Sequence, residues 1–72
     1  MPSTVIRSFS YQPERRELEV TFVTGRIYLY REVPPEEADA FRAAFSKGRY
    51  FNFYIRDRYD YRELTVELHA GP

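Results

Sequence analysis

The chain has 72 residues, which leave room for one hydrophobic core and no second domain. Its eleven basic and eleven acidic residues cancel, so it lacks the strongly basic balance that favours nucleic-acid binding. It contains no cysteine, which excludes disulfide bonds and thiolate metal sites. No apolar run approaches the ~20 residues that span a bilayer. Residues 1–4 lack the basic and apolar regions of a signal peptide, so we expect a cytoplasmic protein.

Aromatic residues and arginines dominate the composition. The seven Tyr and six Phe exceed what so small a core easily hides, because each buried ring removes about 150–250 Å² from water. Some rings should therefore lie at the surface. All basic residues except Lys47 are arginines, whose guanidinium groups stack on rings and form paired hydrogen bonds with phosphate or carboxylate. High-GC coding or adaptation to heat is the simpler explanation of this bias.

The first half of the chain predicts three strands joined by turns. They cover residues 4–11, 17–23 and 26–33. The second alternates cleanly, with Leu18, Val20 and Phe22 on one face, which is typical of a half-buried strand. Gly25 supplies the positive φ that a hairpin turn needs. The third strand is apolar on both faces.

A helix is predicted after Val33 and should end near Lys47, with Gly48 as a left-handed cap. Prolines at its start and acidic residues in its first turn favour this position. Its expected buried stripe consists of Ala38, Phe41, Ala44 and Phe45. Residues 49–61 are expected to be irregular. The sequence thus predicts an α+β fold, an antiparallel sheet of three or four strands with one helix packed on one face.

The C-terminal segment leaves two interpretations open. Residues 63–69 alternate apolar and polar side chains, which favours a fourth strand. A helix that uses Tyr61, Leu64 and Leu68 fits the same residues.

The register of the second hairpin decides where Tyr28 and Tyr30 point. A two-residue turn places both on the face away from the core, where they form an open stacking platform for bases, as in RNA-recognition modules. A three-residue loop with Gly25 in a bulge pairs Val20 with Tyr28 and brings both tyrosines into the core. We favour the second register, because a tyrosine at a core edge with its hydroxyl bonded is the commoner arrangement.

The segment from Lys47 to Arg62 combines basic and aromatic residues. Its charged residues sum to +3, and it holds six rings. This pattern suits a single-stranded nucleic acid, with arginines on phosphates and rings on bases. The structural alternative is that Phe51 and Ile55 anchor the segment to the core while the arginines pair with nearby acids. Asn52 is expected to hydrogen-bond the backbone of the turn, or a base edge if the segment binds RNA.

An ordered set of residues along the chain resembles a known family. It consists of Ser3, Ile6, Tyr11, Leu18, Val20, Phe22, Gly25, Tyr28, Tyr30, Val33, Pro34, Phe41, Ser46, Gly48, Tyr50, Phe51, Asn52, Ile55 and Tyr59. The set is similar to the pattern of KTSC domains, which are named after the C-terminus of some lysyl-tRNA synthetases and also occur as stand-alone bacterial proteins. Residues 60–72 lie beyond the pattern, and Ser10 stands where the family often has glycine. The resemblance implies no established activity, and it suggests RNA binding only through the synthetase association.

The sequence contains few residues that could act in catalysis. The only histidine, His69, lies three residues from the C-terminus, and no serine or threonine has a histidine within sequence reach. No P-loop, dinucleotide fingerprint or metal-ligand spacing is present. We therefore expect neither an enzyme nor a bound metal or cofactor.

We expect a small non-catalytic module whose first candidate ligand is single-stranded RNA or tRNA. The candidate contacts are Lys47, Arg49, Arg56 and Arg58 for phosphates, Tyr28, Tyr30, Tyr50 and Tyr54 for stacking, and Asn52. The alternative is a protein-interaction or homodimerisation module, because one helix covers only one face of the sheet. A phage or mobile-element accessory protein that acts on a host factor is a third hypothesis, and no residue selects it.

Overall fold

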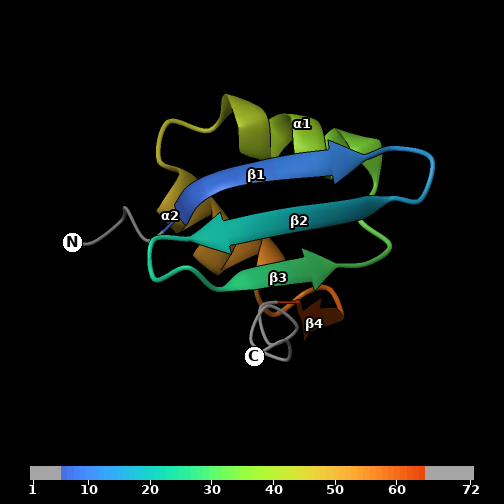
Figure 1. Ribbon diagram of the computed structural model, residues 1–72. Helices are drawn as coiled ribbons and strands as arrows, with labels where there is room; N and C mark the ends of the chain where they lie inside the picture. The colour runs from blue at the N-terminus through green and yellow to red at the C-terminus, as the bar shows by residue number, and fades with distance from the viewer. Residues whose placement is uncertain (1–5, 65–72) are drawn as a thin grey trace.

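The computed structural model describes residues 6–64, which form one antiparallel sheet backed by short helices (Figure 1). The sheet order is β1 (Ile6–Gln12), β2 (Glu17–Phe22), β3 (Ile27–Tyr30) and β4 (Tyr61–Glu63). The helical segments α1 (Pro35–Ala43), α2 (Lys47–Tyr50) and the π-helical η1 (Phe51–Ile55) lie behind the sheet in Figure 1. The predicted α+β fold is confirmed. No helix in residues 6–64 is long and apolar enough to cross a membrane.

The β2–β3 hairpin adopts the register that the sequence analysis favours. Val20 lies opposite Tyr28 and Leu18 lies opposite Tyr30, so both tyrosines face the helices. The loop closes because the Gly25 N–H donates to the Phe22 carbonyl at 2.8 Å. Gly25 has a φ of 97°, a conformation that side chains disfavour. A three-residue loop built on this glycine therefore directs the tyrosines inward.

The core lies between the sheet and the helical segments. Its buried members are Leu18, Val20, Tyr30, Val33, Phe41, Phe51 and Ile55. Ring contacts join its layers, since Phe9 on β1 packs on Phe41 of α1 with centroids 4.4 Å apart. Tyr30 on β3 meets Phe51 of η1 edge to face at 5.4 Å. The predicted anchoring role of Phe51 and Ile55 is confirmed.

The helix after Val33 is shorter than predicted. It ends at Ala43, and Ala44 is already extended with a ψ of 140°. The side chain of Ser46 then accepts a hydrogen bond from the Arg49 N–H and caps a second helix, because a serine oxygen can replace a missing helical acceptor. Gly48 is buried inside that helix and is not a left-handed cap.

Two further predictions for the helical region are wrong. The break after Ala43 turns Phe45 out of the buried stripe, and its side chain is fully exposed. Residues 49–55, the first part of the segment predicted to be irregular, are helical, with the Arg56 N–H bonded to the Phe51 carbonyl at 2.8 Å. Local caps and aromatic anchors outweigh the apolar spacing that suggested one long helix.

The fourth strand begins earlier than predicted. Tyr61 pairs with Tyr30 and Glu63 pairs with Tyr28 across the β3–β4 ladder. Tyr61 is therefore in a strand, which contradicts a helix starting there. The remainder of the predicted strand, from residue 65 onward, lies outside the described residues.

One carboxylate links the helices. Glu37 of α1 accepts hydrogen bonds from the hydroxyls of Tyr50 on α2 and, at 3.0 Å, of Tyr59 after η1. Burial, and then the hydrogen bond to Glu37, raise the pKa of Tyr50 to about 12 and also raise the pKa of Tyr59. Both phenols are therefore stabilised in their neutral form in the folded chain.

Replacing Gly25 with alanine should destabilise the fold, because a Cβ at this φ costs about 1–2 kcal/mol. Urea unfolding followed by circular dichroism measures the change. Val23→Ala, an exposed change in the same loop, is the control and should cost less than about 0.5 kcal/mol. Equal stability of Gly25→Ala and the native chain would contradict the role assigned to this loop.

Stability should fall in alkali. The unfolded chain releases tyrosine protons near pH 10, whereas folded Tyr50 holds its proton to about 12, so the stabilisation present below pH 10 is lost as pH rises through that interval. Melting temperatures measured from about pH 8 to about pH 12 should show this loss, and Tyr50→Phe should flatten the curve because phenylalanine has no such proton.

The control for the alkaline series is Phe53→Leu, a change at an exposed ring of η1 that carries no hydroxyl. It should keep the native pH dependence. If the melting temperatures of Tyr50→Phe and of the native chain fall equally with rising pH, the Tyr50 hydroxyl does not contribute to the loss of stability in alkali.

Candidate functional site

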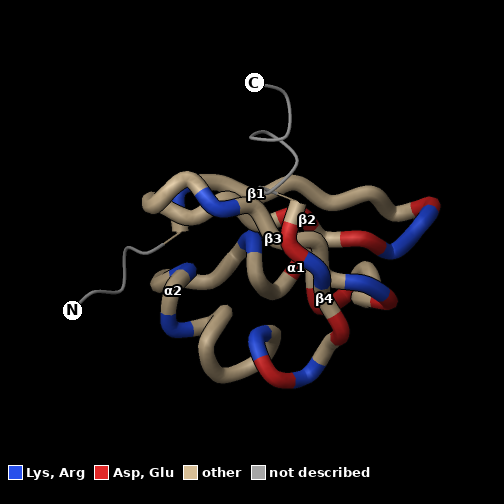
Figure 2. The backbone as a smooth tube through the Cα atoms, turned by 60° about the horizontal axis from the view of Figure 1, so that its bottom comes forward, with Lys and Arg blue, Asp and Glu red and all other residues tan. Residues whose placement is uncertain are grey.

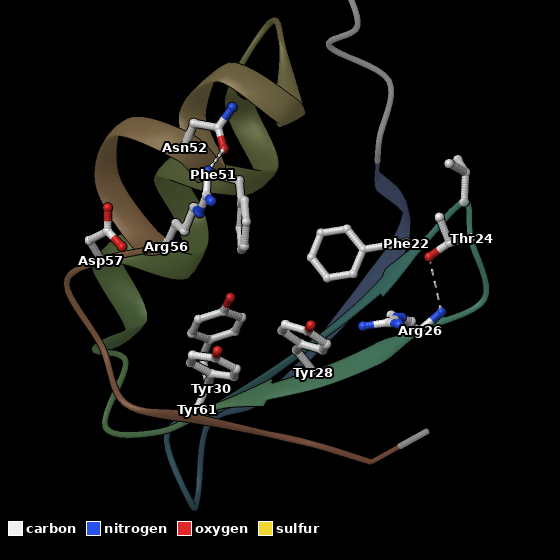
Figure 3. Close-up of a pocket in the computed structure, with 11 residues that line it drawn as sticks. Phe22, Thr24, Arg26, Tyr28, Tyr30, Phe51, Asn52, Arg56, Asp57 and Tyr61 are labelled. Atoms are coloured by element: carbon white, nitrogen blue, oxygen red, sulfur yellow. Dashed lines mark hydrogen bonds between the residues drawn. The ribbon is translucent and has the colours of Figure 1, made fainter. Parts of the chain in front are cut away.

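A cleft of about 600 Å³ lies between the β3–β4 side of the sheet and η1 (Figure 3). Its lining comes from β2, the β2–β3 loop, β3, η1 with the residues that follow it, and β4: Phe22, Val23, Thr24, Arg26, Tyr28, Tyr30, Phe51, Asn52, Arg56, Asp57 and Tyr61. Rings form most of its walls, and two guanidinium groups lie among them.

Hairpin register and helical spacing bring this lining together. Alternation along β3 turns Tyr28 and Tyr30 toward the helices, and the ladder with β4 adds Tyr61 beside them. On the opposite wall, Phe51 and Arg56 are separated by one π-helical turn, so both lie on the sheet side of η1. The cleft therefore depends on strand pairing between segments about thirty residues apart in the chain.

The rings support one another and leave their polar edges in the cleft. Tyr28 and Tyr61 stack with centroids 5.0 Å apart and planes at 7°. Tyr28 also meets Phe22 edge to face at 5.3 Å. Tyr61 is 52% exposed, so it retains free ring surface. The hydroxyls of Tyr28, Tyr30 and Tyr61 point to the same side, toward the space bounded by Phe22 and Phe51 (Figure 3).

The charges in the cleft are two guanidinium groups and one carboxylate. A hydrogen bond with Tyr28, and then the Glu63 carboxylate, raise the pKa of Arg26. Burial raises the pKa of Tyr30 well above its usual range, and the neighbouring phenols add to this effect while Arg56 opposes it. A phenol hydroxyl is protonated at neutral pH even without this shift, so Tyr30 can donate a hydrogen bond in the cleft.

Four of the nine predicted contact residues line the cleft: Tyr28, Tyr30, Asn52 and Arg56. The prediction of a stacking face on Tyr30 is wrong, because this side chain is 1% exposed and only its hydroxyl edge faces the cleft. Asn52 accepts a long hydrogen bond of 3.5 Å from Arg56, which ties the two polar groups of the helical wall.

The other predicted residues lie outside the cleft. Lys47 donates to the Ala44 carbonyl at 2.7 Å, and Tyr50 is bonded to Glu37, so both already have structural partners. Arg49 and Tyr54 are exposed on the helical segment. Arg58 lines a second, polar cavity of about 310 Å³ together with Arg31, Glu32, Tyr59 and Asp60. In Figure 2 two basic residues lie on α2, others are spread over the strands and turns, and basic and acidic residues alternate in the turn leading to β4.

Sequence reasoning missed Arg26 and Tyr61 as site residues. Arg26 directly follows the turn glycine and appeared only as the start of a strand, although a three-residue loop brings it toward Tyr28. Tyr61 was placed in an irregular segment, and its pairing with Tyr30 has no local signal in the sequence. The hairpin register could have indicated Arg26, and nothing in the sequence indicated the pairing of Tyr61.

This lining suits an anionic or planar ligand. Phenol hydroxyls and guanidinium groups donate hydrogen bonds to oxyanions, and the free surface of Tyr61 can stack on a flat ring. Within residues 6–64 no group of three or more histidine, aspartate or glutamate side chains could hold a metal ion.

Known proteins of similar sequence and structure agree on one family. The family model for the KTSC domain matches residues 2–59. An uncharacterized protein of Stutzerimonas stutzeri is 46% identical over 67 residues, 93% of each chain. A lysine–tRNA ligase of Nostoc punctiforme is 34% identical over 62 residues, which are 86% of this chain and 11% of the ligase.

The crystal structure of a KTSC domain protein from Yersinia pestis has the same fold. The two structures superpose with a TM-score of 0.80 at 35% identity, covering 89% of this chain and 90% of the other. The resemblance noted in the sequence is therefore confirmed over most of the domain. The chain belongs to the KTSC domain family.

Proposed function

We propose that this domain is a non-catalytic RNA-binding module of the cytoplasm and that the cleft is its main contact surface. The observation that carries the proposal is the presence of Arg26 and Arg56 in the same cleft as the accessible ring of Tyr61. Guanidinium groups bind phosphates with two hydrogen bonds, and exposed rings stack on unpaired bases.

Basic and aromatic groups also lie beyond the cleft. Arg49 and Tyr54 are exposed on the helical segment that continues into the cleft wall. The Tyr54 ring contacts Tyr50, which packs on Phe41, so Tyr54 lies on the α1 side of this segment. The segment from Lys47 to Arg62 carries a local charge of +3 in a chain of zero net charge. A strand of RNA that leaves the cleft and passes around this segment would meet these groups.

The relatives add support of a different kind. A lysine–tRNA ligase acts on a tRNA by its name, and a segment similar to this chain makes up 11% of the Nostoc punctiforme enzyme. A module attached to such an enzyme is useful if it holds the RNA. This argument comes from association, whereas the cleft supplies the physical basis.

A titration with single-stranded RNA and with tRNA tests the proposal. Two or three phosphate contacts should weaken binding about 10-fold between about 50 and about 200 mM salt, because each contact releases condensed counterions. Fluorescence anisotropy measures the affinities. The double variant Arg26→Gln/Arg56→Gln should bind more weakly and with a shallower salt dependence.

The matched control is Arg42→Gln, which removes an arginine on α1 whose guanidinium is paired with Asp39 at 2.9 Å. It should bind RNA like the native chain. Absence of binding at low salt, or affinity that does not change with salt, would exclude the proposal.

A second candidate is homodimerisation, with another copy of the chain as partner. It is favoured by the exposed rings of Phe45 and Phe53, the latter 69% exposed. Large exposed apolar groups are common at protein interfaces.

Light scattering over a concentration series tests self-association. If the exposed rings form an interface, the apparent mass should rise toward that of a dimer, and Phe45→Ser/Phe53→Ser should return it to the monomer. A monomeric mass at every concentration would exclude this candidate. Arg49→Gln, an exposed polar change on the same helical segment, is the control and should leave the mass unchanged.

A further inference from the structure

The cleft concentrates hydrogen-bond donors in a small space. The hydroxyls of Tyr28, Tyr30 and Tyr61 point to one side, and the guanidinium groups of Arg26 and Arg56 complete the lining (Figure 3). Each guanidinium group donates without accepting, and each phenol hydroxyl can donate. This set is complementary to a phosphate group, whose oxygens accept several hydrogen bonds at once.

The size of the cleft limits the ligand. Its volume of about 600 Å³ lies in the range of pockets that hold one small molecule, and it is too small for a duplex. The donors share the cleft with Tyr61, whose free ring surface offers a place for one flat ring. The lining therefore suits a single ligand that carries both an anionic group and an aromatic ring.

We propose that the cleft binds one unpaired nucleotide of the RNA, with its phosphate on the guanidinium groups and phenol hydroxyls and its base on the exposed ring of Tyr61. The inference rests on the proposed RNA-binding function and names its ligand unit. A nucleotide would contact both the hydrogen-bond donors and the Tyr61 ring. Inorganic phosphate would contact only the donors, and a nucleoside would contact only the ring.

Tyr30 and Asp57 also line the cleft and should affect phosphate binding in opposite directions. The Tyr30 ring is buried and its hydroxyl edge faces the cleft, where it can donate a hydrogen bond. Among residues 6–64, Asp57 is the one acid that lines the cleft, and its exposed carboxylate would repel a bound phosphate. Removing this charge should strengthen phosphate binding, an effect that general damage to the fold would not produce.

The experiment is an NMR titration of the full chain with uridine monophosphate, adenosine monophosphate, uridine and inorganic phosphate. We expect the two nucleotides to bind at least about 10-fold more tightly than uridine or phosphate. Arg26→Gln and Arg56→Gln should each weaken nucleotide binding about 10-fold, because each removes a charge-assisted hydrogen bond. Asp57→Asn should tighten it.

A separate variant tests the proposed stacking of the base on Tyr61. Tyr61→Leu should weaken binding of the nucleotides while leaving that of phosphate unchanged, since only the base uses the ring. The matched controls Arg42→Gln and Phe45→Ser lie outside the cleft and should bind like the native chain. The two-dimensional spectrum of each variant shows whether it is folded.

The outcomes separate the two proposals. If RNA binds with the expected salt dependence and Arg26→Gln/Arg56→Gln weakens it, but the mononucleotides do not bind, the nucleotide pocket is excluded and RNA binding at the cleft stands. If phosphate binds as tightly as the nucleotides, the base contact is excluded. If neither RNA nor nucleotide binds, both proposals fail.

Discussion

The β2–β3 hairpin register is the constraint on which the rest of the structure depends. Gly25 at φ 97° allows a three-residue loop, and this loop turns Tyr28 and Tyr30 toward the helices. A shift by one residue would send both rings to the other face of the sheet. The core would lose Tyr30, and the cleft would lose the phenol hydroxyls of Tyr28 and Tyr30 and keep that of Tyr61. One backbone conformation thus determines both the packing and the site.

The helical wall is positioned by a different set of contacts. Ser46 starts α2, Phe51 and Ile55 anchor η1 in the core, and Glu37 holds the hydroxyl of Tyr50. These contacts come from a cap, from apolar burial and from a hydrogen bond that links two helices. Together they keep the guanidinium-bearing end of η1 above the tyrosines. The cleft lies at the edge of the core that the sheet and the helical segments share, where Tyr30 and Phe51 belong to both.

The sequence predicted the parts of this architecture that depend on local patterns. Alternation in β2 and the glycine turn were sufficient for the hairpin, and the ordered residues up to Tyr59 indicated the family. The prediction for α1 relied on apolar spacing alone and placed the end of the helix beyond Ala43. Apolar spacing does not show that Ser46 caps a new helix. Tyr61 was missed as a cleft residue because the Tyr30–Tyr61 pairing is a long-range contact without a local signal.

Core and site share residues in so small a domain. Tyr30 is almost wholly buried and Phe51 belongs to the same core cluster, yet both line the cleft. Truncating either ring would leave a cavity and destabilise the fold, so such variants cannot separate binding from stability. Arg26, Arg56 and Asp57 are exposed and carry the charge of the site, and their substitution leaves the packing intact. In this domain the buried rings define the shape of the cleft, and the exposed charges at its edge determine which ligand it can hold.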